Sequence, residues 1–191
     1  MNKGNKYCSL NIENCFNHKL FYTDTVEAEK EIEPGLEGLY INIKENNISS
    51  HLQSPKGIPF KLNLGKKDNF YCDGQILKIG LQTDEIHFLG FCYFGDMNIK
   101  VVLRMKSGGE QIIDVHMREC SIDSNCDGWY TIFTPDHDKL ESVARFITAG
   151  RAKQPFYIFD RTCILPQAYE VEELFIPKNI FFHILAVTIK V

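Results

Sequence analysis

Side chains that could carry out chemistry are concentrated between residues 114 and 138 of this 191-residue chain. His116, Cys120 and Cys126 are ligands of the types that zinc prefers, and His137 would be a fourth. Structural zinc sites usually pair ligands two to four residues apart, and the set as a whole fits that spacing poorly. These three residues are therefore weak metal candidates, and the sequence predicts neither a metal nor a cofactor.

The same segment contains the side chains of a thiol hydrolase, with Cys120 or Cys126 as the nucleophile and His116 or His137 as the base. Such a pair needs hydrogen-bond contact in space, which no spacing in this sequence enforces. The chain also lacks a Gly-x-Ser-x-Gly turn, a glycine-rich phosphate loop before a helix, and a His-Glu-x-x-His helix. The sequence therefore favours binding over catalysis and identifies no catalytic residue.

Strands must position most of these residues, because hydrophobic and polar side chains alternate with a period of two along much of the chain. This alternation is found in four segments, namely residues 39–43, 58–64, 77–81 and 97–105. Two further segments, residues 86–94 and 180–189, are apolar on both faces and predict central strands. Turn residues at 107–109 predict a hairpin over residues 97–119, and Asp73-Gly74 predicts a second hairpin.

One well-defined helix is predicted at about residues 135–149. Thr134 suits the N-cap, Pro135 the first helical position, and Gly150 the end of the helix. Leu140, Val143, Ala144 and Ile147 recur at three- and four-residue spacing, which is the pattern of an apolar stripe. A second, weaker helix is predicted from Thr25 to Ile32.

The fold class that follows is mainly β, a β-rich α+β protein. About nine strands would form an antiparallel β-sandwich or open barrel, with the helix packed on a face or closing an end. At this length a single domain over residues 1–191 is expected, with residues 1–20 as a loosely packed N-terminal segment. Such a chain can bury a sizeable core without disulfide or metal support.

Composition excludes several classes of protein. A formal net charge of -4 argues against a dedicated nucleic-acid binder, and 12% aromatic residues argue against a disordered chain. The first twelve residues lack the apolar run of a secretory signal, and the longest apolar stretch is too short to span a membrane. Seven irregularly spaced cysteines indicate reduced structural thiols. We therefore expect a cytoplasmic protein with neither nucleic-acid nor membrane partners.

The small net charge is a near-cancellation of separate blocks. Acidic residues gather in residues 24–37, 114–138 and 170–173, whereas residues 44–67 are basic. If the acidic segments met on one face, their field would steer a basic partner toward it. The other interpretation is three unrelated solvated loops. The residues predicted to bind the partner come from the second acidic block: Glu119, Asp123, Asp127, Asp136 and Asp138.

Two hypotheses about function follow. The first is a non-catalytic cytosolic binding protein that masks a basic protein partner through an acidic face. Bacterial immunity proteins, which neutralise cognate toxins, are of this general kind in size and charge, although the chain contains no motif of such a family. The alternative is a β-barrel or sandwich that binds a small ligand, or an enzyme with an apolar pocket, lined by the aromatic residues of segments 88–94 and 156–159.

Overall fold

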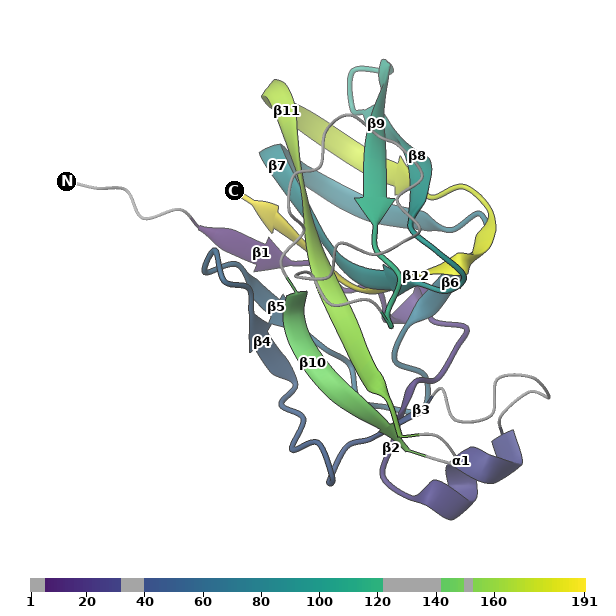
Figure 1. The fold of residues 1–191 in the computed structure, drawn as a ribbon. Helices are drawn as coiled ribbons and strands as arrows, with labels where there is room; N and C mark the ends of the chain where they lie inside the picture. The colour runs from purple at the N-terminus through teal and green to yellow at the C-terminus, as the bar shows by residue number, and fades with distance from the viewer. Residues whose placement is uncertain (1–5, 32–39, 122–141, 150–152) are drawn as a thin grey trace.

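A computed structural model describes residues 6–31, 40–121, 142–149 and 153–191. Twelve strands, one α-helix and one short 3-10 helix lie in this part of the chain (Figure 1). In chain order they are β1 (Tyr7–Ser9), η1 (Glu13–Cys15), β2 (Phe21–Tyr22), α1 (Thr25–Glu31), β3 (Tyr40–Asn42), β4 (His51–Gln53), β5 (Pro59–Lys61), β6 (Phe70–Cys72), β7 (Ile76–Cys92), β8 (Met97–Met105), β9 (Glu110–Met117), β10 (Ser142–Ala149), β11 (Pro155–Phe175) and β12 (Asn179–Lys190).

Ten of the strands form one sheet that curves into a half-barrel, while β4 and β5 pair only with each other. The main path runs β1-β12-β7-β11-β10-β3-β2, with β8 and β9 continuing from β11 and β6 pairing with β12. All pairs are antiparallel except β2 with β3. The expected β-rich open barrel is therefore confirmed. Figure 1 shows β8 and β9 at the opposite end of the molecule from α1.

The two longest strands, β7 and β11, are neighbours in the sheet. Residues 76–90 of β7 pair with residues 159–175 of β11. Their register shifts between Ile164 and Tyr169, where an irregularity allows the long pair to bend. Residues 86–92 of β7 and residues 182–189 of β12 are buried throughout, as their apolar sequences predicted. These strands form the centre of the fold, and the segments at their ends lie next to the candidate site.

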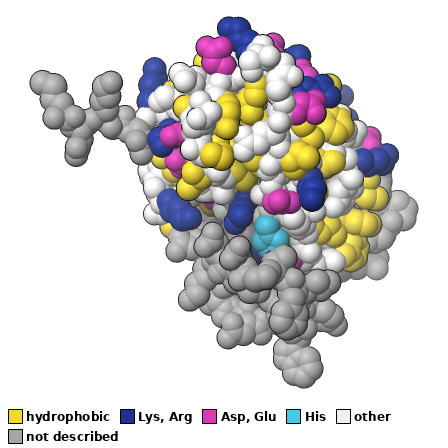
Figure 2. Space-filling view, turned by 90° about the horizontal axis from the view of Figure 1, so that it is seen from above, with side chains coloured by type: hydrophobic (Ala, Val, Ile, Leu, Met, Phe, Trp, Pro, Cys, Tyr) yellow, Lys and Arg dark blue, Asp and Glu magenta, His cyan; other side chains and the backbone are white. Residues whose placement is uncertain are grey.

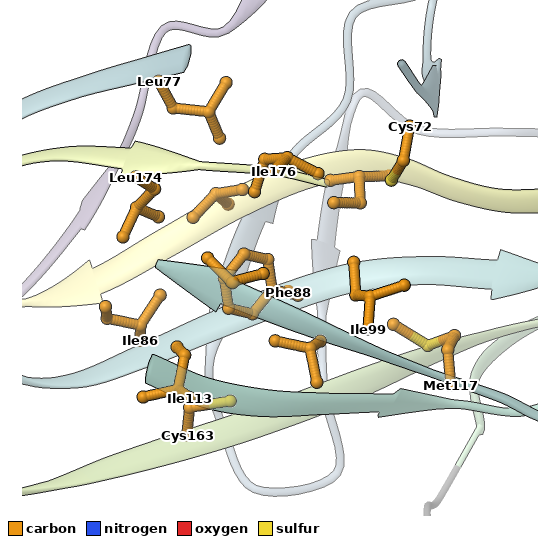
Figure 3. Close-up of a cluster of buried hydrophobic side chains, with 14 of the residues drawn as sticks. Cys72, Leu77, Ile86, Phe88, Ile99, Ile113, Met117, Cys163, Leu174 and Ile176 are labelled. Atoms are coloured by element: carbon orange, nitrogen blue, oxygen red, sulfur yellow. The ribbon is translucent and has the colours of Figure 1, made fainter. Parts of the chain in front are cut away.

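The curved sheet encloses a hydrophobic core on one face. In Figure 3, Phe88 of β7 lies among side chains of β8, β9 and β11, such as Ile99, Ile113 and Cys163, and residues of β12 belong to the same core. A second core covers the other face, where Leu89 and Phe91 of β7 meet Ile58 and Phe60 from the segment that contains β5. Successive β7 residues therefore enter different cores, which explains why this segment is apolar on both faces.

The predicted hairpin over residues 97–119 is confirmed, because β8 and β9 pair in one continuous register from Met97–Met117 to Arg104–Glu110. The weaker helix prediction is confirmed by α1 within the described residues. The Asp73-Gly74 hairpin prediction is wrong. Gly74 has the positive φ of a tight turn (85°), but β6 pairs with β12 rather than with β7.

The helix predicted at 135–149 is wrong for Ser142–Ala149, which form strand β10. Residues 135–141 lie outside the described residues. Strand β10 pairs with β11, where Phe146 lies opposite Phe156, and with β3, where Thr148 lies opposite Ile41. Because the segment is rich in β-branched and aromatic residues, pairing with two strands outweighs a three-and-four spacing that propensity supports only weakly. Phe146 and Thr148 are buried on either side of the less buried Ile147, as in a strand, although Ala149 at the end of the strand is buried as well.

Candidate functional site

Two phenylalanine side chains are exposed together where β7 ends and β12 begins. Phe94 follows β7 and is 73% exposed, and Phe181 lies on β12 and is 40% exposed. Their ring centroids are 5.2 Å apart and the rings meet edge to face. Ile180, which precedes Phe181 on β12, is 50% exposed. We call Phe94, Ile180 and Phe181 the aromatic patch.

The backbone of Phe94 is strained. Its φ is 61°, in the left-handed region that bulky side chains rarely adopt. The left-handed conformation costs an L-residue roughly 1–2 kcal/mol, and glycine or asparagine would adopt it more readily. An exposed ring gains little from the core to offset this cost. Strain of this kind is concentrated at ligand-binding and other functional positions.

Glu119, the one described member of the predicted partner-binding set, lies beside the turn that contains Phe94. The backbone N–H of Glu119 donates to the Asp96 carboxylate at 3.0 Å, and the N–H of Cys120 donates to the carbonyl of Cys92 at 3.0 Å. Residues 118–120 are thereby bonded to both sides of the turn. The Glu119 carboxylate is half-buried and accepts a hydrogen bond from Ser121 Oγ at 2.9 Å. The backbone of Glu119 therefore lies next to the turn that contains Phe94.

Charges of both signs accompany that carboxylate. Asp96 Oδ2 lies 3.8 Å from Arg118 Nε and 4.0 Å from His116 Nε2. Asp96 is thus shared between a structural hydrogen bond and two basic side chains. Glu119 differs from it in being bonded to a neutral hydroxyl in the described structure. This makes Glu119 the better acceptor for a cation brought by a partner.

The remaining predicted site residues have different outcomes. Asp123, Asp127, Asp136, Asp138 and Cys126 lie outside the described residues. His116 is half-buried beside Asp96, whereas Cys120 is buried in the second core with its pKa raised by burial. In the described part of the chain, no group of three or more His, Cys, Asp or Glu side chains is arranged to hold a metal ion.

The third acidic block does not form an unpaired acidic surface. Glu173 bonds both Lys78 and Arg104, Arg104 also bonds Glu110 at 3.0 Å, and Glu170 lies 3.7 Å from Lys106. Lys78, Glu173, Arg104 and Glu110 come from four adjacent strands, so opposite charges alternate across the sheet. Figure 2 likewise shows Lys and Arg interspersed with Asp and Glu on the face it presents, with hydrophobic side chains exposed between them. Sequence blocks alone could not reveal these cross-strand partners.

A second polar cluster was not identified from the sequence. His87 is buried in the sheet, with Nδ1 3.1 Å from Thr162 Oγ1 and 3.4 Å from Asp160 Oδ1. Its Nε2 lies 2.9 Å from Glu85 Oε1 without the alignment of a hydrogen bond. A hydroxyl, an imidazole and a carboxylate in a row resemble a nucleophile with its base and orienting acid. With the ring 1% exposed, however, the cluster is closed to solvent, and it leaves His87 Nε2 and Asp160 Oδ1 without a hydrogen-bond partner among the described residues.

The aromatic segments proposed as pocket linings pack into the cores. Phe91 contacts Phe156 at 4.9 Å and Tyr93 at 5.1 Å between ring centroids, and Phe88 and Phe159 are fully buried. The six described cysteines are free, and four of them are buried. No helix in the described ranges is long and hydrophobic enough to cross a membrane.

Comparison with known proteins adds nothing to this description of the aromatic patch. No family model matches the chain, and no curated protein is significantly similar to it.

Proposed function

We propose that this chain is a non-catalytic cytosolic binding protein that docks a partner protein through the aromatic patch and Glu119. The observation that carries the proposal is Phe94, a ring exposed to solvent on a strained backbone. Folding alone favours neither feature. Binding interfaces commonly combine an apolar, often aromatic, centre with a polar rim. The free thiols, four of them buried, agree with a reducing compartment.

We infer the class of partner from the chemistry of the patch. Phe94 and Phe181 would fill an apolar depression, and Glu119 would receive a Lys or Arg side chain near its border. A basic surface of this form is consistent with the overall net charge of -4, which favours association with cationic proteins. A cationic toxin neutralised as immunity proteins neutralise theirs is a partner of this class.

Affinity capture tests the proposal with paired baits. The wild-type chain and a Phe94→Gly/Phe181→Ala variant are incubated with lysate of the source cell at low and high salt. We expect a stoichiometric basic protein on the wild-type bait that is absent from the variant bait. Equal recovery of the same proteins on both baits would show that the patch does not dock a partner.

Replacing Phe94 with glycine should separate stability from binding. The Phe94→Gly variant relieves the left-handed strain and loses one exposed contact with Phe181, so its free energy of unfolding should stay unchanged or rise by up to about 1 kcal/mol. Partner affinity should fall at least about tenfold, since aromatic anchors typically contribute that much. Denaturant titration and calorimetric binding measure the two effects. The matched control is Ile164→Ala, because Ile164 is 76% exposed on β11 and should leave affinity unchanged.

Neutralising Glu119 should act mainly on association. We expect Glu119→Gln to slow binding several-fold and to make the association rate less dependent on salt, because a rim charge steers encounter. Stopped-flow binding at several ionic strengths measures this. Glu172→Gln is the control, as it removes the same charge from β11, where Glu172 acts on Lys78. Identical salt dependence for Glu119→Gln and the wild type would argue against a basic partner at this position.

A further inference from the structure

A buried carboxylate holds the segment that precedes α1. Asp68 is fully buried, and its two oxygens accept the backbone N–H groups of Leu20 and Phe21, each at 2.9 Å. The carbonyl of His18 in turn accepts the backbone N–H of Asp68 at 3.2 Å. We call residues 17–21, as held by these bonds, the N-terminal latch. It anchors β2, which pairs with β3.

A side-chain amide links this carboxylate to two imidazoles. Asn69 Nδ2 donates to Asp68 Oδ1 at 2.8 Å, so the amide oxygen of Asn69 faces the other way. That oxygen lies 2.9 Å from Nδ1 of His183 on β12 and 3.2 Å from Nδ1 of His18 in the latch. The two imidazole centroids are 5.0 Å apart. An acid and two bases therefore meet at one buried amide.

The surroundings of the acid and of the β12 imidazole are well defined. The positive charge of Lys19 lowers the pKa of Asp68, in opposition to burial. Burial raises the pKa of Tyr93, and the nearby Asp68 raises it further. The rings of His18, Tyr71 and Tyr93 meet His183 edge to face, and Phe91 stacks on it at 4.7 Å. The Ile180 backbone also bonds the imidazole. Apart from Lys19, nothing among these groups brings a permanent positive charge to the cluster.

We infer that Asp68 and His183 act as a compensating proton pair, joined through Asn69, that keeps the N-terminal latch closed from neutral to mildly acidic conditions. When the latch is closed, a proton taken up on acidification resides on the carboxylate. When it opens, the carboxylate returns that proton to solvent and the exposed imidazole binds one. The number of bound protons then hardly changes on opening, so acidification favours neither state.

Burial supports this assignment in both groups. It raises the pKa of Asp68 from 3.8 to about 6 in the closed latch, and it lowers the pKa of His183 well below 6.5. Between about pH 4 and 6 the closed state holds one more proton at Asp68, so Asp68 favours closure as pH falls. Below 6.5 the open state holds one more proton at His183, so His183 favours opening as pH falls. The two effects have opposite signs in the same window.

Hydrogen exchange at the Leu20 and Phe21 amides tests the pair, after correction for intrinsic exchange rates. Between pH 7 and 5 the opening constant of the wild type should change less than about threefold. As the pH falls, the opening constant should rise by up to about tenfold per pH unit in Asp68→Asn. In His183→Asn it should fall at a similar rate below pH 6. Both slopes are those that one-proton linkage requires. The double variant should again be nearly flat.

The same pH dependence in all four proteins would overturn the inference. A second measurement needs no variant: ¹⁵N shifts of the His183 ring in the intact protein at pH 5.5 should be those of a neutral imidazole. An imidazolium signal at that pH would overturn the assignment of the proton to Asp68, even if Asp68→Asn failed to fold.

Discussion

Replacing Gly90 with alanine should destabilise the protein by more than about 4 kcal/mol, the range of backbone and core disruptions. Gly90 lies in the buried half of β7, between Phe159 of β11 and Ile184 of β12. A Cβ at this position would lie 2.2 Å from the backbone oxygen of His183, far inside van der Waals contact. A backbone atom in a central strand cannot move aside without breaking the pairing of β7 with β12.

Denaturant titration of Gly90→Ala beside Gly109→Ala measures the effect. Gly109 lies in the turn between β8 and β9, has no positive φ, and an added Cβ would meet nothing within 4 Å. We expect the control to stay within about 0.5 kcal/mol of the wild type. A Gly90→Ala protein as stable as the Gly109→Ala control would show that β7 and β12 do not approach as closely as the structure has them.

Truncating Phe91 to alanine should cost about 3–5 kcal/mol, the usual range for a buried phenylalanine. Its ring is fully buried, stacks on His183 at 4.7 Å and meets Phe156 and Tyr93 edge to face. The substitution removes these ring contacts and leaves a cavity in the second core that backbone pairing on both sides prevents from collapsing.

Thermal and denaturant unfolding of Phe91→Ala is compared with Phe94→Ala, three residues along. Phe94 is 73% exposed, so its truncation should change the free energy of unfolding by less than about 1 kcal/mol. The contrast distinguishes a ring that stabilises the fold from a ring retained for another purpose. Equal losses for the two variants would mean that Phe94 belongs to the core, which would remove the main support for the docking proposal.

Much of the fold could be predicted because strand patterns survive in local sequence. The alternation in residues 97–105 and the turn at 107–109 were sufficient to locate the β8–β9 hairpin. The helix predicted at 135–149 is wrong over residues 142–149, because this segment pairs with the strand that follows it, β11, and with β3, which lies far earlier in the chain. The length of β11 was missed for a similar reason. Its charged residues 170–173 resemble a loop until Lys78 and Arg104 are brought opposite Glu173.

Less of the candidate site could be predicted. Glu119 was selected for its charge, and the structure adds its position beside the Phe94 turn. The sequence signal for Phe94 is an apolar run that continues past the strand into Gly95-Asp96, a place where polar turn residues are usual. Nothing local shows its left-handed backbone or its contact with Phe181, since both depend on β12 being paired with β7. The link between Asp68 and His183 likewise joins residues 115 positions apart.

Hydroxyl-radical footprinting of the complex tests the docking proposal most directly, because it reports side-chain exposure without substituting any residue. The captured partner is added to the chain, and oxidation of exposed aromatic and aliphatic side chains is compared with that of the free chain. The docking proposal predicts strong protection of Phe94, Ile180 and Phe181, with Ile112 and Ile164, which are exposed elsewhere, oxidised as before. Protection of Ile112 or Ile164 with an unchanged aromatic patch would contradict it.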